Sequence, residues 1–331
     1  MLRILHGTHY DFIKPWRIAV GITIAFIAIG LVYLGVHGIN QSIEFTGGTL
    51  MQVQFVQPPN VADIRATVDG AGYPGSEIQQ FGSPREFTVR AATHGQSATA
   101  QGAVENTAKE IQAALEQKFG ANDIRVVRTE IVGPRVGDEL KRNAIIAILI
   151  SLLVTLLYLA FRFEWRFGVA AVLATFHDLL STLAFLSIMR LEVSLTVVAA
   201  LLTVIGYSLN DTIIIFDRVR ENLKKQRNES LYAVLNRSIN ETLPRSILTH
   251  VTVAAATLSL LLFAGEVIRP FSWIMLFGIV TGTFSSIYIA GPVLLWIEHR
   301  WPRARGEKHS SVRPSQVGPT RAPSRPTAGV R

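Results

Sequence analysis

Six long runs of apolar residues, separated by charged or polar segments, dominate the pattern along the chain. An α-helix needs about 20 apolar residues to cross roughly 30 Å of hydrocarbon, and each run is close to that length. We therefore predict six membrane-spanning helices. They cover residues 18–36, 144–161, 168–189, 195–216, 246–264 and 271–297.

The first run has a second interpretation, because it follows Lys14 and Arg17 in the manner of a signal peptide. It is, however, longer than the apolar part of a typical signal peptide. No Ala-x-Ala cleavage site follows it. We expect residues 1–17 to be a short terminal segment and the run itself to be a retained helix.

The segment 37–140 has the periodicities of a small water-soluble domain. Its order β-α-β-β-α-β is the ferredoxin-like arrangement, so the fold class is a polytopic α-helical membrane protein with an inserted α+β domain. We expect this domain to bind or pack rather than to catalyse. Its expected strands and helices are Leu50–Val56, Val61–Ala71, Ser76–Phe81, Glu86–Ala91, Gly102–Phe119 and Asp123–Val132.

Two further segments are polar. The connection 217–244 is predicted to be a loop that is helical in part, and four of its residues would form the apolar face of an interfacial helix. These four are Leu231, Val234, Leu235 and Ile239. The tail 298–331 is basic and rich in Pro, Ser and Thr, without an apolar period, and is predicted to be disordered.

The distribution of charge predicts the orientation. The chain carries 32 Lys and Arg against 24 Asp and Glu, a net charge of +8. Among the short loops and tails, the basic residues are concentrated before the first run, after the second, after the fourth and after the sixth. The short connections after the third and fifth runs contain only Arg190 and Arg269, respectively. By the positive-inside rule both termini are cytoplasmic, the cytoplasmic loops face anionic lipid, and the domain 37–140 lies on the opposite side.

Several kinds of chemistry are excluded or disfavoured. With no cysteine, the chain has no disulfide, thiolate metal site or thiol nucleophile. No His-Glu-x-x-His motif, nucleotide-binding motif or acid/base cluster occurs. We expect no enzymatic activity, no cofactor, no metal and no nucleic-acid partner.

Ionisable residues inside the apolar runs are the candidate functional groups, because charge is costly in a membrane. Asp211 lies in the cytoplasmic half of the fourth run, and Arg245 opens the fifth run at a matching depth. The two side chains would pair, or Arg245 would instead extend to the interface. His177 and Asp178 lie in the middle of the third run and would serve either as a polar contact between helices or in proton movement.

Two glycine motifs flank the soluble domain. Phe45 to Thr49 reads FTGGT and contains Gly47 and Gly48, and Val132 to Leu140 reads VGPRVGDEL and contains Gly133 and Gly137. No Lys-Ser or Lys-Thr follows the glycine pair, so a phosphate site is disfavoured. We interpret the four glycines as hinges between domain and membrane.

These motifs together resemble the SecF family, the accessory subunits of the bacterial preprotein translocase, which belong with the RND-type transporters. The resemblance covers about Ile4 to Glu298. Its most specific part is Gly206 to Asn222, which reads GYSLNDTIIIFDRVREN, and the two glycine motifs and His177-Asp178 agree with it.

The resemblance implies a multi-pass protein of the bacterial inner membrane that forms a twelve-helix, pseudo-symmetric heterodimer with SecD. It implies association with the SecYEG channel and with translocating unfolded polypeptide, and use of the proton-motive force in late steps of export. The family's proton-path aspartate and arginine match Asp211 and Arg245. Asn210, His177 and Asp178 are further candidates for this path.

Two other functions remain open. One is a non-conducting scaffold that stabilises SecD and the channel, which the position of Asp211 argues against. The other is a self-sufficient transporter of small solutes, which usually has an internal inverted repeat. We find no convincing repeat among the six runs.

A reporter fused at Gly95 tests the orientation. An enzyme that is active only outside the cytoplasm is expected to be active in this fusion, because the domain 37–140 is placed on the exported side by the charge distribution. The same enzyme fused after Arg303 provides the matched control and is expected to be inactive. Activity of the second fusion and not the first would reverse the topology.

Overall fold

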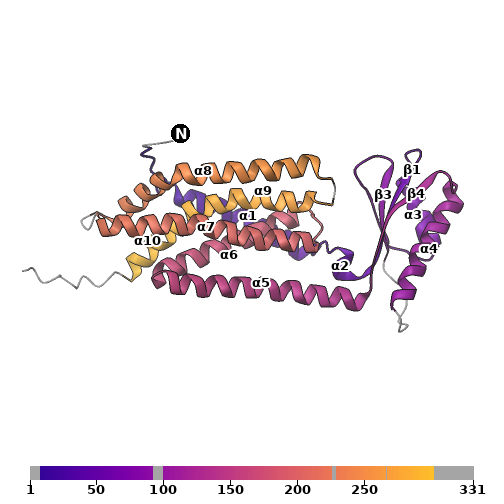
Figure 1. The fold of residues 1–331 in the computed structure, drawn as a ribbon, viewed down its shortest axis with the longest axis horizontal. Helices are drawn as coiled ribbons and strands as arrows, with labels where there is room; N and C mark the ends of the chain where they lie inside the picture. The colour runs from indigo at the N-terminus through magenta and orange to yellow at the C-terminus, as the bar shows by residue number, and fades with distance from the viewer. Residues whose placement is uncertain (1–7, 92–99, 226–228, 266, 302–331) are drawn as a thin grey trace, which may run out of the picture.

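The computed structural model describes residues 8–91, 100–225, 229–265 and 267–301. A bundle of long helices carries a small sheet domain at one end, and the long helix α5 (Pro134–Arg162) leads from that domain along the bundle (Figure 1). The predicted disorder of the tail, from residue 302 onward, lies outside the described residues, as does Gly95.

Six helical segments of the described residues are long and apolar enough to cross a membrane, which confirms the predicted fold class. The sixth segment is not one regular helix: its middle turn widens into a π-helix just before Pro292, a residue that would clash with the carbonyl of a regular turn. Besides α5, the segments are α1 (Trp16–His37), α6 (Trp165–Ile188), α7 (Leu195–Lys225), α8 (Leu231–Phe263), and α9 (Arg269–Ser285) continued by η1 (Ser286–Ala290) and α10 (Gly291–Arg300).

The sheet domain has the predicted β-α-β-β-α-β order. Its four strands are antiparallel in the order β2-β3-β1-β4, and α3 and α4 cover one face of the sheet. Alternate residues of β1 point into the core, where Met51 and Val53 pack against Ile64 and Leu115. The elements are β1 (Gly48–Phe55), α3 (Val61–Gly70), β2 (Glu77–Gln80), β3 (Glu86–Ala91), α4 (Ala100–Phe119) and β4 (Ile124–Val132).

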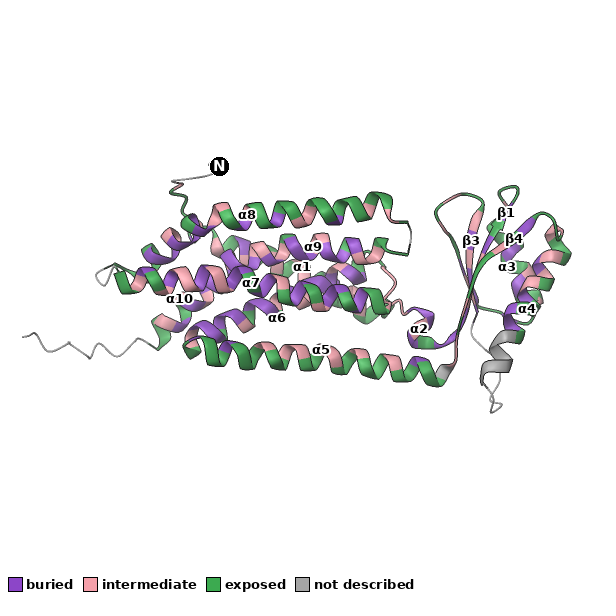
Figure 2. Cartoon of the chain, in the orientation of Figure 1, coloured by how far each residue is buried: buried purple, intermediate pink, exposed green. Residues whose placement is uncertain are grey.

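Burial divides the bundle into central and peripheral helices. In the sixth segment, which consists of α9, η1 and α10, 61% of the residues in the most apolar stretch are buried. In α5 the corresponding share is 6%. α6 and α7 are central as well, whereas α1 and α8 expose much of their apolar surface (Figure 2). Apolar side chains on the exposed faces of α5 and α8 suit contact with lipid or with another membrane protein.

The segment 217–244 is helical in part, as predicted, but its helices continue the fourth and fifth spans and do not form a separate interfacial helix. α7 continues to Lys225, and α8 begins at Leu231 and runs through Pro244 into the fifth span. Val234, Leu235 and Ile239 are buried in the protein core instead of facing the membrane surface. Their apolar face therefore packs against the bundle, since α7 extends far enough past the membrane run to cover it.

The sheet domain is held against the connection between α6 and α7. In this connection Val193 exchanges backbone hydrogen bonds with the linker that precedes the domain, accepting from Ser42 N at 2.9 Å and donating to Asn40 O at 2.8 Å. Arg90 of β3 forms an ion pair with Glu192 at 2.5 Å and with Glu77 at 2.6 Å. Burial raises the pKa of the Glu192 carboxyl above its usual range, and the Arg90 guanidinium opposes that shift.

Replacement of Arg90 by Met is expected to loosen this attachment. Glu77 and Glu192 would then face each other without their shared cation, and loss of a charged hydrogen bond costs about 1.5 kcal/mol or more. Hydrogen exchange of the backbone amides of Ser42 and Val193 should accelerate about tenfold. Arg125→Met, at an exposed position on β4, is the control and should leave the exchange unchanged. Equal rates in both variants would show that the ion pairs do not hold the domain.

Candidate functional site

Two carboxylates are buried among the residues that the structure describes, and both lie in the central helices. Asp178 of α6 is 0% exposed and Asp211 of α7 is 4% exposed. Both are among the predicted candidates. A buried carboxylate is stable only when hydrogen bonds or a cation satisfy it, or when it is protonated, so the partners of each oxygen decide what it does.

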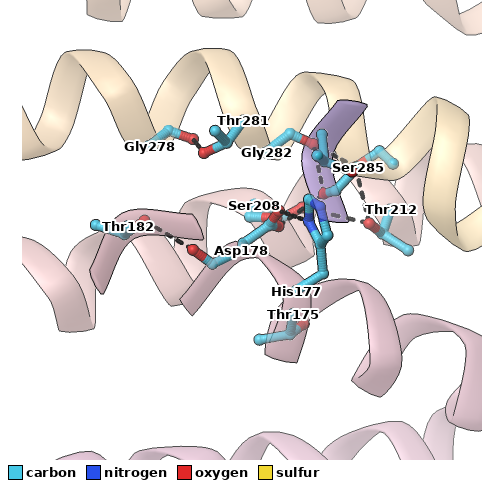
Figure 3. A network of polar contacts seen from close by, with 12 residues as sticks. Thr175, His177, Asp178, Thr182, Ser208, Thr212, Gly278, Thr281, Gly282 and Ser285 are labelled. Carbon is cyan, nitrogen blue, oxygen red and sulfur yellow. Dashed lines mark hydrogen bonds and ion pairs between the residues drawn. The ribbon is translucent and has the colours of Figure 1, made fainter. Parts of the chain in front are cut away.

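Asp178 is surrounded by hydrogen-bond donors from three helices (Figure 3). Its Oδ2 accepts hydrogen bonds from the hydroxyls of Ser208 on α7 and Ser285 on α9, the second at 2.7 Å. Its Oδ1 lies 3.1 Å from Nδ1 of His177. Adjacent residues on a helix point about 100° apart, so the sequence did not require this contact. The carboxylate thereby joins α6, α7 and α9 at one point.

Two glycines of α9 make this junction possible. A Cβ atom added to Gly282 would lie 2.9 Å from Cβ of Ser208, and one added to Gly278 would overlap the side chain of Val204. The spacing Gly-x-x-x-Gly is a common motif of close helix contact in membranes. Without these glycines, α9 would stand further from α7 and Ser285 would not reach Asp178.

Asp211 has a different environment, at the contact between α7 and α8. Its Oδ1 accepts a hydrogen bond from Ser246 Oγ at 2.5 Å. Its Oδ2 is buried and has no hydrogen-bond partner among the described residues. His250, one helical turn beyond Ser246, is its ionisable neighbour. Asp211 therefore has fewer partners than Asp178 and is the carboxylate better suited to bind and release a proton.

The predicted pairing of Asp211 with Arg245 is not seen in this structure, although both residues are described. Arg245 is exposed, and its neighbour Ser246 contacts Asp211 instead. Because adjacent helical residues point about 100° apart, α8 presents one of these two side chains to α7 and turns the other away. Asn210, next to Asp211, is likewise exposed.

The two glycine motifs, far apart in sequence, pack against each other where the domain meets the bundle. A Cβ atom on Gly137 of α5 would lie 3.0 Å from the backbone nitrogen of Gly47, which follows the short helix α2 (Ile43–Thr46). Gly47 and Gly48 have φ angles of 71° and 123°, which favour glycine, and Gly133 caps α5. This geometry explains the motifs by close packing and turns, and their role as hinges stays a prediction.

The sequence did not single out the serine donors Ser208, Ser246 and Ser285, nor Tyr207 and His250. Serine is common on apolar helices, so its position gives little information before the faces of the helices are known. A signal was nevertheless present, because Gly278 and Gly282 mark the face of α9 that approaches a neighbouring helix closely.

Comparison with known proteins gives a consistent result. Residues 111–300 match the family described as protein export membrane protein SecD/SecF, C-terminal, and residues 32–59 match the SecD/SecF GG motif. The chain is 61% identical to the protein translocase subunit SecF of Gemmatimonas aurantiaca, over 92% of this chain and 91% of that protein. It is 42% identical to the SecF subunit of Desulfurispirillum indicum, over 88% of this chain and 93% of that one.

Solved structures agree with this similarity. The crystal structure of SecDF, a translocon-associated membrane protein from Thermus thermophilus, superimposes with a TM-score of 0.80 at 34% sequence identity. The superposition covers 91% of this chain and 40% of the SecDF chain. A SecDF structure in the super-membrane-facing form matches with a TM-score of 0.65 at 36% identity, over 90% of this chain and 40% of that one.

Replacement of Asp178 by Ala is expected to destabilise the bundle. It removes the acceptor of Ser208 and Ser285 and the partner of His177, and hydrogen bonds between membrane helices contribute about 0.6 kcal/mol each on average. We expect a loss of about 2 kcal/mol in the free energy of unfolding, measured in lipid bilayers. Ser181→Ala, one turn away on α6, is the control, since its buried hydroxyl has no hydrogen-bond partner among the described residues. Equal stability of the two variants would contradict a structural role for Asp178.

Proposed function

Because the chain belongs to the SecF family of protein translocase subunits, we propose that it acts with SecD to couple the proton-motive force to late steps of protein export. Its place is the bacterial inner membrane, which it spans with six helices as an accessory subunit of the Sec translocase. In the proposed topology both termini are cytoplasmic and the sheet domain is periplasmic.

The observation that best supports the proton role is the incomplete set of partners of Asp211. An ionised carboxylate with one unpartnered oxygen is costly in a helix bundle, and protonation removes that cost. The protonation state of Asp211 therefore changes the free energy of the contact between α7 and α8. A proton that crosses the membrane potential releases about 2.3 kcal/mol per 100 mV, enough to bias two arrangements of packed helices.

The sheet domain is connected to these helices through the segment between α6 and α7. This segment is bonded to the linker before the domain through Val193 and to the domain itself through Glu192. A shift of α7 that follows protonation of Asp211 would displace the segment, and the domain would move with it. We propose that the domain contacts translocating unfolded polypeptide through its edge strands β2 and β4.

SecD is the proposed partner, and SecYEG the proposed channel. The chain matches 40% of the length of a SecDF chain, so SecD would supply the other half of the assembly and of the proton path. Arg245 is exposed on α8 in the isolated chain, at a depth where the cost of a charge in lipid is high. In the heterodimer, SecD would bury the Arg245 side chain and so remove it from lipid. A rotation of α8 would bring Arg245 next to Asp211.

A non-conducting scaffold is the second candidate function, and the Asp178 junction favours it. A carboxylate bonded by three donors holds helices together without any need to titrate. A scaffold of this kind would stabilise SecD and the channel and would give Asp211 no special role. A self-sufficient small-solute transporter has no comparable observation in its favour.

Replacement of Asp211 by Asn separates the two candidates. The variant keeps the shape and a hydrogen-bonding oxygen but does not titrate, so the chain should still insert and bind SecD. We expect this variant to lose the part of export that depends on the proton gradient, measured in membrane vesicles that contain the complex. Arg245→Ala should lose the same part of export or export more slowly.

Asp217→Asn is the matched control. Asp217 lies on the same helix, its side chain is 39% exposed and it forms an ion pair with Arg162 at 2.7 Å, so water reaches it and export should be retained. A normal response of Asp211→Asn to the gradient, at equal protein level, would overturn the proton role and leave the scaffold function.

A further inference from the structure

His250 is the buried ionisable residue that the proposed mechanism has not yet used. Its side chain lies on α8, faces α7 and is 9% exposed. Its Nδ1 is buried and has no hydrogen-bond partner among the described residues, and Oδ2 of Asp211 and the Tyr207 hydroxyl share that condition. Within the described part of the chain, three buried polar atoms from two adjacent helices thus lack a hydrogen-bond partner, and they lie in one region of the bundle.

The helix geometry places these groups in two successive layers. Asp211 and Ser246 form one layer through their hydrogen bond. Tyr207 and His250 form the next, with ring centroids 5.4 Å apart in an edge-on contact at 71°. Tyr207 precedes Asp211 by one turn and His250 follows Ser246 by one turn, so α7 and α8, which run in opposite directions, bring the layers together. The second layer lies nearer the sheet domain, because Tyr207 is closer than Asp211 to the first residue of α7, Leu195, which is bonded to Glu44 just before that domain.

We propose that Asp211 and His250 form one unit that shares protons, with His250 on the side of Asp211 that faces the sheet domain. This inference rests on the proposed function and adds a second proton-carrying group to its site. With one proton the unit is neutral as carboxyl and imidazole, or an ion pair as carboxylate and imidazolium. Transfer between the two breaks an N–H bond and forms an O–H bond, and no electron is exchanged.

Charge balance explains why His250 would help Asp211 to carry a proton. A lone carboxylate changes the net charge of its surroundings whenever it gains or loses a proton, and a low-dielectric bundle penalises net charge. The unit instead keeps zero net charge while its proton moves from one helix to the other. Tyr207 positions the imidazole through its ring contact and offers a hydroxyl that has no hydrogen-bond partner among the described residues.

The other groups near the unit are few. Arg245 lies five residues before His250 on α8, and its side chain is exposed. α9 packs against both helices and has no ionisable side chain between Pro270 and Ser285. On the α6 side, Asp178 accepts a hydrogen bond from Ser208, and His177 contacts Asp178. The titration of Asp211 should therefore depend on His250 more than on any other imidazole of the described residues.

The first test is an infrared pH titration of the full chain bound to SecD in lipid bilayers. The carboxyl band of Asp211 is identified by its loss in Asp211→Asn. In the wild type we expect this band to change in two steps. Two sites titrate as a pair when protonation of one shifts the pKa of the other by about one unit or more. In His250→Gln it should change in a single step, with a midpoint moved by about one pH unit or more. His37→Gln, at the end of α1, is the matched histidine control and should behave as the wild type.

A reciprocal measurement does not depend on the stability of His250→Gln. With the imidazoles of this chain labelled for nuclear magnetic resonance, Asp211→Asn should alter the titration of one of its eight histidines and leave the other seven unchanged. Proton-driven export of His250→Gln should persist with its pH profile displaced by about one pH unit, by the same coupling.

The outcomes separate this inference from the proposed function. If Asp211→Asn exports normally, the proposed function fails, whatever the spectra show. If Asp211→Asn loses gradient-dependent export while His250→Gln keeps both the wild-type carboxyl titration and the wild-type pH profile, the paired unit alone is overturned. An unchanged set of histidine titrations in Asp211→Asn would overturn it as well.

Discussion

The cost of an unsatisfied carboxylate in a low-dielectric bundle is the constraint on which the rest of this structure depends. Asp178 and Asp211 meet it in different ways. Asp178 has hydrogen-bonding partners on both oxygens, drawn from its own helix and from two others, and needs nothing further. Asp211 has one serine donor and one buried oxygen without a hydrogen-bond partner among the described residues, so its stable state depends on a proton or on a change in packing. The same residue type therefore connects three helices in one place, and in the other has the incomplete bonding on which the proposed proton role rests.

Close packing of the helices makes these environments possible. Lipid is as apolar as leucine, so membrane helices gain little from apolar contact and depend instead on close approach and hydrogen bonds. Gly278 and Gly282 let α9 approach α7, and this approach sets Ser285 beside Asp178. α8 is more peripheral, and only 17% of its most apolar stretch is buried. This peripheral helix is also the one that carries Ser246, Arg245 and His250.

The sequence predicted the architecture because its signals are local. Runs of about 20 apolar residues identify spans without reference to a fold, and strand alternation identified the β-α-β-β-α-β domain in the same way. The cost of charge in lipid also singled out Asp211 and Asp178. Their partners could not be predicted, because these depend on how each helix is rotated about its axis. A rotation of about 100° decides whether Arg245 or Ser246 faces Asp211, and no pattern within α8 determines it. The course of α8 through Pro244 was missed for a related reason, since the packing against α7 that supports it is not local.

The same packing determines how a change at Asp211 would reach the sheet domain. α7 is one uninterrupted helix from Leu195 to Lys225, so Asp211 and the first turn belong to a single rigid element. That first turn is fixed from outside the helix: Glu44, from the short helix before the domain, accepts a hydrogen bond from Leu195 N at 2.6 Å. A carboxylate at a helix N-terminus is favoured by the helix dipole and satisfies a backbone donor that would otherwise lack a partner. Because Glu44, Val193 and Glu192 all join the domain side to this end of α7, the helix cannot shift along its axis without moving the domain or breaking several bonds. In the proposed mechanism, a small displacement at Asp211 would thus be transmitted by the stiffness of one helix, and no longer chain of contacts would be required.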